Sequence, residues 1–317
     1  MNNNNKKIAI TIGDPNSIGA EIAVKAINSG CIDTNKIILF ANKNILDFYN
    51  LKLECDVEFV EIDFDINNIT VGQNSKFGGE FAYKTLEYIL TNTNKYNLKS
   101  LVTAPVSKYA LNLAGYNYSG QTEILQKFIG NEKQKAQMLF VANDFRIMLL
   151  TRHIPILDVP KAITVDLLFN SISQLNNELK KYYKIENPKI ALCALNPHAG
   201  ENGVLGNEEV NIFEKAINNL RKANICISEP YPADALLKKA GYYYLKNEKQ
   251  PYDCYISAYH DQGLCAIKPI SQENCVNTTI GLDILRTSPC HGTAFDIAGK
   301  NIADATSMIC ALKDADI

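Results

Sequence analysis

Residues 7–30 read KIAITIGDPNSIGAEIAVKAINSG, and this stretch sets the fold class. Residues 7–12 form a short apolar run with several β-branched side chains, which predicts a buried β-strand. Gly13-Asp14-Pro15 follows at once as a turn, and Gly19 opens a helix that we expect over Ala20–Asn28. Gly30 suits the position just past that helix, because glycine readily adopts the left-handed backbone that ends helices. The stretch therefore predicts a strand, a turn and a helix in succession.

The same alternation of short strands and helices continues along the chain. Further strands are expected at Lys36–Ala41, Val57–Ile62, Ser100–Thr103, Met138–Ala142, Arg146–Thr151, Lys189–Leu195, Ile225–Ser228 and Cys254–Ala258. Further helices are expected at Glu80–Asn92, Val165–Lys181 and Glu208–Ala223. Asn143-Asp144 separates two of the strands, so residues 138–151 are expected to form a hairpin. The pattern predicts an α/β fold with largely parallel sheets.

Composition and charge exclude several classes of protein. The 317 residues are 46% hydrophobic, which is enough for one large or two medium domains. The 32 basic and 34 acidic residues nearly balance, whereas nucleic-acid-binding proteins usually carry a basic excess. No apolar run approaches the roughly 20 residues that span a bilayer, and the apolar run after the N-terminus is too short for a signal sequence. We therefore expect a cytoplasmic protein without nucleic-acid or membrane partners.

The 9 cysteines are scattered, and none belongs to a C-x-x-C pair. This pattern argues against a disulfide framework and against a zinc ribbon. Buried thiols in a reducing compartment are the interpretation that we favour.

Three of the 4 histidines follow predicted strands. His153 comes after the strand that ends near residue 151, His198 after residues 189–195, and His260 after residues 254–258. The carboxyl ends of parallel strands meet at one edge of a sheet, where α/β proteins bind ligands. A lone histidine in a loop is more often solvated or hydrogen-bonded than bound to a metal. Spacing alone leaves both hypotheses open, and a three-histidine site would leave the open metal positions that catalysis needs.

Two polar residues at predicted helix starts have competing interpretations. Thr122 either contacts an anion or caps its helix, and capping is favoured. Asp234 is either a general base or a helix cap, and the cap is again favoured.

The Gly13-Asp14-Pro15 turn places backbone N–H groups at a helix start, where anions bind, but a plain structural turn explains it equally well.

Lys268, Asn277 and Arg286 lie within a short span after His260. Arginine binds phosphate or carboxylate through two hydrogen bonds, and lysine supplies a point charge. Each residue alone is best explained as a surface polar group. Together, near a candidate metal loop, they indicate an anionic substrate.

The most distinctive segment is residues 291–300, HGTAFDIAGK, which is polar and punctuated by glycine. Alone it predicts only a turn. Together with other segments in order along nearly the whole chain, it resembles the 4-hydroxythreonine-4-phosphate dehydrogenase family of pyridoxal phosphate biosynthesis. The other segments are Gly13-Asp14-Pro15, Thr103-Ala104-Pro105, Gln121-Thr122-Glu123, Leu195–Glu201, Tyr231–Asp234, Tyr259–Gly263 and Arg286-Thr287-Ser288.

The resemblance implies two α/β/α domains with a cleft between them. The fold would be similar to that of isocitrate and isopropylmalate dehydrogenases rather than a Rossmann fold, which agrees with the missing G-x-G-x-x-G motif. One domain would hold residues 1–125 and 265–317, including a cofactor loop, and the other residues 126–264, with the metal loops and the dimer contacts. Family members are homodimers whose active site uses both subunits, so a homodimer with a shared site is implied.

The resemblance also implies residue roles. Three histidines match the ligands of one divalent ion, zinc, cobalt or magnesium: His153, His198 and His260. Five residues match substrate contacts: Gln121, Thr122, Lys268, Asn277 and Arg286. Asp234 matches a residue close to the substrate and is the candidate catalytic base. Five loop residues would hold NAD or NADP: His291, Gly292, Thr293, Ala294 and Asp296.

The activity implied is oxidation of 4-phosphooxy-L-threonine to a β-keto acid, which loses CO2 to give 3-amino-2-oxopropyl phosphate. Several departures from the family pattern bear on this activity. Gln121 stands where a histidine is usual and cannot carry a charge. Cys290 replaces an aspartate, while Asn16, Ser17 and Ala20 replace the more usual alanine, glycine and proline.

Three rival hypotheses remain at this point. One is a dehydrogenase of a phosphorylated sugar acid such as erythronate or threonate 4-phosphate, which Gln121 keeps open. Another is a three-histidine metal hydrolase, which the 291–296 loop argues against. The last is a family member that binds metal or NAD without turnover.

Overall fold

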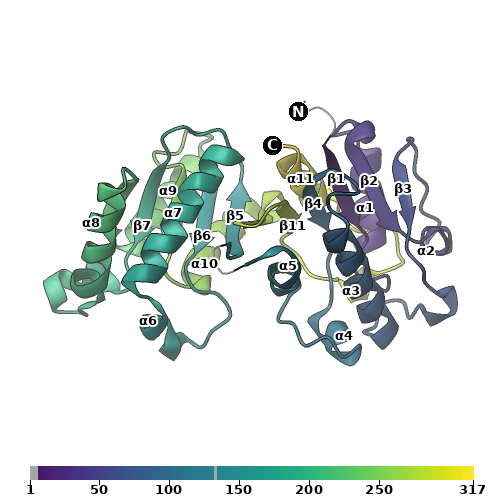
Figure 1. The fold of residues 1–317 in the computed structure, drawn as a ribbon, viewed down its shortest axis with the longest axis horizontal. Helices are drawn as coiled ribbons and strands as arrows, with labels where there is room; N and C mark the ends of the chain where they lie inside the picture. The colour runs from purple at the N-terminus through teal and green to yellow at the C-terminus, as the bar shows by residue number, and fades with distance from the viewer. Residues whose placement is uncertain (1–5, 132–133) are drawn as a thin grey trace. The chain divides into compact units, whose positions relative to one another are not determined.

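The computed structural model describes residues 6–131 and 134–317. The chain divides into two compact units, and each contains a set of largely parallel β-strands. Unit 1 is Met1–Ala136 with Val276–Ile317, and unit 2 is Gln137–Cys275. In Figure 1 the purple, blue and yellow segments belong to unit 1, and most of the teal and green segments belong to unit 2.

The sheet of unit 1 has the strand order β3-β2-β1-β4-β11-β10. The central pairs are parallel, and only β10 runs antiparallel to its neighbour β11. The bounds are β1 Lys7–Thr11, β2 Ile37–Ala41, β3 Glu58–Glu61, β4 Leu98–Thr103, β10 Val276–Ile280 and β11 Leu285–Pro289. Strands β1 and β2 are buried almost throughout, because their Ile, Leu, Phe and Ala side chains form the core of this unit.

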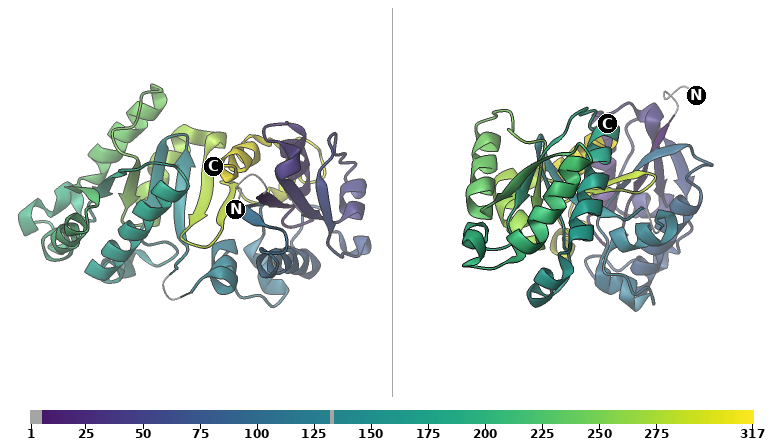
Figure 2. Two further views of the ribbon diagram at one scale, coloured as in Figure 1. Left: turned by 45° about the horizontal axis from the view of Figure 1, so that its top comes forward. Right: turned by 60° about the vertical axis from the view of Figure 1, so that its left-hand side comes forward.

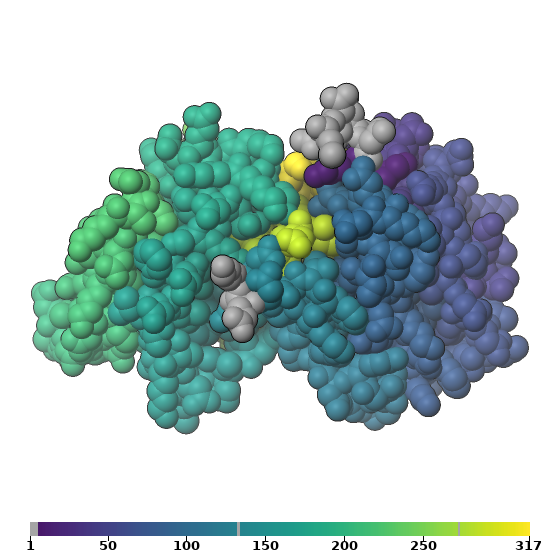
Figure 3. Space-filling model, viewed as in Figure 1, coloured from purple at the N-terminus to yellow at the C-terminus, as the bar shows by residue number. Residues whose placement is uncertain are grey.

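The helices of unit 1 form two groups of contacts. Helix α1 (Gly19–Asn28) packs on α11 (Thr306–Ala315), and α3 (Lys76–Thr91) contacts α4 (Lys108–Leu113) and α5 (Gln121–Ile129). The short α2 (Lys43–Phe48) follows β2. In the space-filling view, the blue-to-teal surface of the α3–α5 region is turned to the viewer (Figure 3).

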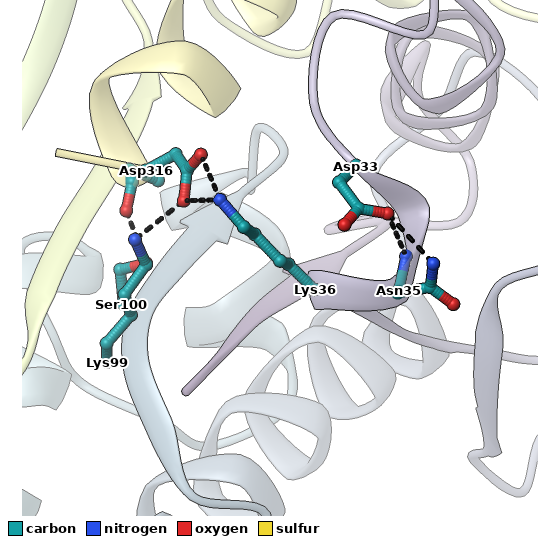
Figure 4. A network of polar contacts seen from close by, with 7 residues as sticks. Asp33, Asn35, Lys36, Lys99, Ser100 and Asp316 are labelled. Carbon is teal, nitrogen blue, oxygen red and sulfur yellow. Dashed lines mark hydrogen bonds and ion pairs between the residues drawn. The ribbon is translucent and has the colours of Figure 1, made fainter. Parts of the chain in front are cut away.

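The C-terminal helix is tied to the N-terminal strands by a network of polar contacts (Figure 4). The carboxylate of Asp316 forms ion pairs with Nζ of Lys36 at 2.9 Å and with Nζ of Lys99 at 2.7 Å. The hydroxyl of Ser100 donates to the carbonyl of Ala315 at 2.7 Å. These contacts help to explain how the last segment of the chain joins the first in one unit.

Unit 2 has the strand order β5-β6-β9-β7-β8. The strands are β5 Gln137–Ala142, β6 Phe145–Leu149, β7 Lys189–Cys193, β8 Cys226–Tyr231 and β9 Cys254–Ser257. The pairs from β6 to β8 are parallel, whereas β5 and β6 form an antiparallel hairpin. The helices are α6 Val159–Ala162, α7 Val165–Lys181, α8 Glu214–Lys222, α9 Ala233–Leu245 and α10 His260–Ser271. Helix α8 contacts β8, α9 and α10 contact β6, and α7 packs on α8; Figure 2 shows the teal and green helices of this unit from two further sides.

The predicted α/β class, all the predicted strands, the hairpin and the helix stop at Gly30 are confirmed. The helix expected over Glu208–Ala223 contains a π-helical turn, Glu209–Phe213, before α8 begins. Strands β10 and β11 were not predicted, since their threonine-, serine- and asparagine-containing sequences lack a long apolar run.

The borders of the two units differ from the predicted segments 1–125 plus 265–317 and 126–264. Residues 126–136 go with unit 1, because α5 runs to Ile129 and packs on α3. Residues 265–275 go with unit 2, because α10 continues through them to Ser271 and packs on α9.

Among the described residues, no helix combines the length and apolar character needed to cross a membrane. None of the nine cysteines is in a disulfide bond.

Candidate metal and anion sites

The carboxyl ends of β6, β7 and β9 lead to the three candidate ligands in unit 2. His153 and His260 come together there, with ring centroids 5.7 Å apart and ring planes tilted by 45°. Both line a hollow of about 260 Å³, together with Arg152, Ile154, Ile156, Val159, Tyr259 and Asp261. The parallel strands therefore place two of the imidazoles as the sequence predicts.

The ring of His260 is oriented by its neighbour. Its Nδ1 lies 2.7 Å from Oδ1 of Asp261, so Nε2 is the nitrogen left to face a ligand. Metal-bound histidines usually have such a carboxylate or carbonyl on the second nitrogen, which fixes the tautomer and makes the ligand more basic. The two imidazoles at this hollow are therefore donors of the kind that a divalent ion binds.

His198 is exposed and is not gathered with the other two histidines. Over residues 6–131 and 134–317, no group of three His, Cys, Asp or Glu side chains is close enough to hold a metal ion. His198 begins a run of five residues with left-handed backbone, His198–Asn202. Four of these five are not glycine, so the turn is strained.

A buried carboxylate holds the base of this turn. Oε1 of Glu209 accepts hydrogen bonds from the backbone N–H groups of Leu195 and Asn196, both at 2.9 Å. Oε2 accepts from the side chain of Asn196 at 2.9 Å and approaches Gly200 so closely that a Cβ there would lie 2.8 Å away. Glu209 was not singled out from the sequence, because it lies 11 residues beyond His198 in a helical segment.

A larger hollow of about 830 Å³ lies beside the metal candidates in unit 2. Asp234 lines it together with Asn196 and Tyr259, and Tyr259 also lines the histidine hollow. Asp234 lies in the first turn of α9, which begins at Ala233 after the cap residue Pro232. The interpretation of Asp234 as the helix cap is therefore wrong, and its exposed carboxylate faces this hollow.

Gln262 joins the strand ends that carry these loops. Its Oε1 accepts from the N–H of Ala258 at 2.7 Å, and its Nε2 donates to the carbonyl of Ala194 at 2.9 Å. The side chain thus links the end of β9 to the end of β7. No signal in the sequence marks this cross-link, apart from its place in the Tyr259–Gly263 segment.

In unit 1, Arg286 is the centre of a buried polar site. Its side chain is 3% exposed, and its Nε donates to the hydroxyl of Thr103 at 2.9 Å. Nη1 lies 3.5 Å from the hydroxyl of Thr279, which in turn lies 3.5 Å from that of Thr122. Within the described ranges, no carboxylate makes an ion pair with Arg286, so its charge is compensated only by hydroxyls and by more distant groups.

Burial lowers the pKa of Arg286 to about 10, although Cys290 and Glu123 act in the opposite direction. The guanidinium therefore remains charged at neutral pH. A buried cation without a paired carboxylate is costly, and an anionic ligand would repay that cost.

The register of β10 and β11 places further groups on the face that carries Arg286. Thr279 lies opposite Arg286 and Asn277 opposite Ser288, so these four side chains share one face. Oδ1 of Asn277 is buried and, in the part of the chain described, has no hydrogen-bond partner. An unpaired buried oxygen of this kind is a natural contact for a ligand.

Gln121 and Thr122 begin α5 beside this site. Nε2 of Gln121 donates to the carbonyl of Ala104 at 3.1 Å, whereas its Oε1 is buried with no described partner. Thr122 is 4% exposed, and the helix is capped by Gly120 without a side-chain bond. The capping interpretation of Thr122 is therefore wrong. Lys268, the fifth predicted contact, is exposed on α10 in unit 2.

The predicted cofactor loop follows β11 as an irregular segment of unit 1. The carbonyl of Thr293 accepts from the N–H of Ile18 at 3.3 Å, and Ala294 has a left-handed φ of 42°. His291 and Asp296 are exposed, and a Cβ added to Gly292 would meet nothing within 4 Å. This exposed backbone is open to a ligand on the side of residues 291, 292 and 296.

This chain is similar to known proteins over nearly its full length. The profile of the family described as pyridoxal phosphate biosynthetic protein PdxA matches residues 5–315. A 4-hydroxythreonine-4-phosphate dehydrogenase of Sulfurihydrogenibium sp. (strain YO3AOP1) is 34% identical, with 97% of this chain and 96% of that protein covered. A protein of Bradyrhizobium diazoefficiens with the provisional name D-threonate 4-phosphate dehydrogenase is also 34% identical, with 98% and 96% covered.

Among solved structures, a 4-hydroxythreonine-4-phosphate dehydrogenase from Klebsiella pneumoniae superposes with a TM-score of 0.83 at 27% identity. The match covers 98% of this chain and 99% of that one. Sequence and fold thus agree over nearly the full length, and the chain belongs to the PdxA family of oxidoreductases.

Proposed function

We propose that this protein oxidises 4-phosphooxy-L-threonine with NAD or NADP in a reaction that depends on a divalent metal ion. The product would be a β-keto acid that loses CO2 to give 3-amino-2-oxopropyl phosphate, a step of pyridoxal 5'-phosphate biosynthesis. The observation that carries the proposal is the buried Arg286, which is surrounded by hydroxyls and has no described ion-pair partner.

The substrate phosphate would occupy the face of unit 1 that carries Arg286. The guanidinium offers charge and directional N–H groups, and the hydroxyls of Thr103, Thr122 and Thr279 add donors. Gln121 and Asn277 would complete the contacts through their side-chain amides, and Lys268 would contribute a further positive charge. Fixing the charged end in this way holds C3 of the substrate in place for reaction.

His153 and His260, with His198, would hold the ion, which is zinc, cobalt or magnesium. A bound divalent ion supplies Lewis-acid chemistry that favours negative charge on the C3 oxygen. Asp261 keeps the Nε2 atom of His260 facing that position. Asp234 would accept the proton of the C3 hydroxyl, since its carboxylate lines the neighbouring hollow.

Residues 291–294 and 296 would hold the nicotinamide cofactor, which accepts the hydride from C3. The exposed backbone around Gly292 allows close approach of a dinucleotide. A homodimer with a site shared between subunits is part of the proposal. His198 stands apart from His153 and His260 within one chain, and a second copy offers a way to complete a three-histidine set.

A second candidate substrate is a phosphorylated sugar acid such as erythronate or threonate 4-phosphate. Gln121 supports this second candidate, because its neutral amide stands where the family usually has a histidine. The similarity to the Bradyrhizobium protein points the same way. A metal hydrolase, the rival of another class, has no support from the family match.

The test measures NADH or NADPH formation after removal of metal by a chelator, with and without added zinc, cobalt or magnesium. Parallel assays would contain 4-phosphooxy-L-threonine, D-erythronate 4-phosphate and D-threonate 4-phosphate. We expect metal-dependent turnover in which the rate with 4-phosphooxy-L-threonine is higher than the rate with either sugar acid. Faster turnover of a sugar acid would establish the second candidate, and no turnover of any of them would reject both.

A further inference from the structure

The turn after β1 is held by its own buried side chains. Asp14 and Asn16 are fully buried, and Oδ1 of Asp14 accepts from the backbone N–H of Asn16 at 3.0 Å. The hydroxyl of Ser17 donates to the carbonyl of Asp14 at 2.7 Å and accepts from the N–H of Gly19 at 3.0 Å. Residues 13–19, which we call the first loop, therefore form a rigid base before α1 begins.

Asn16 uses its remaining polar groups to hold a second loop, residues 70–75. Its Oδ1 accepts from the N–H of Thr70 at 2.8 Å, and its carbonyl accepts from the N–H of Gly72 at 2.9 Å. Its Nδ2 donates to the hydroxyl of Ser75 at 2.9 Å, and Ser75 caps α3. Both ends of the amide are thus committed to the second loop.

The second loop in turn lies against the segment that follows β11. A Cβ on Gly72 would come within 2.6 Å of the carbonyl oxygen of Phe295, and one on Gly299 within 3.0 Å of Val71. The first loop also touches this segment directly, where the N–H of Ile18 donates to the carbonyl of Thr293 at 3.3 Å. The three pieces of chain form one continuous layer in unit 1.

We infer that Asn16 is a positioning residue for the loop of residues 291–297, and through it for the nicotinamide cofactor. The cofactor part of this inference rests on the proposed function. An alanine at this position could make neither amide contact. The support that Asn16 gives to the 291–297 loop therefore depends on its side-chain amide.

The experiment compares Asn16→Ala with a matched control, Asn42→Ala. Asn42 is also a buried asparagine of unit 1, and it makes two comparable bonds, to the N–H of Ile45 and the carbonyl of Ile62. None of its described hydrogen bonds goes to any of the three loops. Both variants lose buried hydrogen bonds, so thermal unfolding should move to lower temperature in each.

Three readouts separate positioning from general stability: the Kd for NADH from its own fluorescence, the KM for NAD against the KM for substrate, and amide hydrogen exchange of residues 291–297. In Asn16→Ala, we expect Kd and KM for the dinucleotide to rise roughly three- to tenfold, as for the loss of one or two hydrogen bonds. The substrate KM should stay within about twofold, and exchange of the 291–297 loop should accelerate. Asn42→Ala should change neither dinucleotide binding nor exchange of this loop.

Unchanged dinucleotide binding and unchanged exchange in Asn16→Ala would overturn the inference. Equal effects in the two variants would also overturn it, because they would reflect stability alone. If the wild-type protein binds no dinucleotide, the proposed cofactor fails, and the exchange comparison then decides whether Asn16 positions the loop. Should Asn16→Ala fail to fold, Asn16→Ser provides the smaller change, with effects expected in the same direction.

Discussion

Nε of Arg286 on β11 donates to the hydroxyl of Thr103 at the end of β4, 2.9 Å away, although the two residues are 183 positions apart in the sequence. The bond joins two neighbouring parallel strands in the interior of the strand order of unit 1. It fixes the guanidinium plane, so the remaining N–H groups point in a set direction. An anion bound there would meet a preorganised donor rather than a mobile side chain.

Arg286→Lys should weaken binding of the phosphorylated substrate while keeping the positive charge. Lysine has no planar fork and cannot reproduce the bond to Thr103 together with a two-point contact to phosphate. We expect KM to rise about 10- to 100-fold, which corresponds to roughly 1.4–2.8 kcal/mol. Steady-state kinetics would measure this change. Arg146→Lys, which alters an arginine stacked on Tyr183 in unit 2, is the control and should leave KM in place.

His260→Ala and Asp261→Asn should lower metal affinity to different extents. His260→Ala removes a proposed ligand, whereas Asp261→Asn changes only the residue that orients it. Loss of such an orienting partner typically lowers metal affinity 10- to 100-fold, and loss of the ligand should lower it further. Competition with a chromophoric chelator would give both dissociation constants. His291→Ala, which changes the chain's remaining histidine, should bind the ion as the wild type does. Equal metal affinity in His260→Ala and the wild type would remove His260 from the site.

Asp14→Asn should stabilise the protein at neutral pH. Burial raises the pKa of Asp14 from 3.8 to about 6, against a smaller opposing effect of the Asn16 N–H. The folded state therefore binds this proton more tightly than the unfolded chain, and stability falls as pH rises from about 4 to about 6. The variant lacks this loss, which amounts to at most about 3 kcal/mol. Urea unfolding at pH 4.5 and pH 7.5 should show a stability gain that is larger at pH 7.5, and a gain independent of pH would contradict the explanation.

Asp316→Asn should destabilise unit 1 at neutral pH by about 1 kcal/mol, because the pair with Lys36 and Lys99 is only partly buried. Burial alone would raise the pKa of Asp316, but hydrogen bonds from Lys99 and Lys36 outweigh it and the pKa is lowered. The stabilisation is therefore present above the ordinary carboxyl pKa of 3.8 and is lost as pH falls through the lowered value. Thermal unfolding at pH 7 and near pH 3 would measure this loss. Asp33→Asn, which keeps a good helix cap and whose carboxylate makes no ion pair with a described lysine, is the control.

The sequence was most informative where function depends on strand ends. Because β6 and β9 are parallel neighbours, His153 and His260 had to emerge at the same edge, and they do. His198 also follows its strand, yet a strained turn separates it from them within one chain. Local spacing cannot reveal the direction in which such a turn points.

The anion site was harder to foresee in its details. Thr279 reaches Arg286 only through the register of β10 and β11, two short strands whose polar residues hide them from apolar periodicity. The bridge made by Gln262 and the support that Asn16 gives to the second loop depend equally on long-range packing. Propensity and spacing identify such residues as polar loop positions and no more.

The discontinuous build of unit 1 has a consequence for synthesis on the ribosome. Unit 2 is one uninterrupted stretch of chain, so it can fold while translation continues. β4 lacks its neighbour β11, and α1 lacks its partner α11, until residues 276–317 have left the exit tunnel. While unit 2 is being made, the nascent protein therefore carries an exposed β4 edge, and it is during this interval that chaperones have a surface to bind.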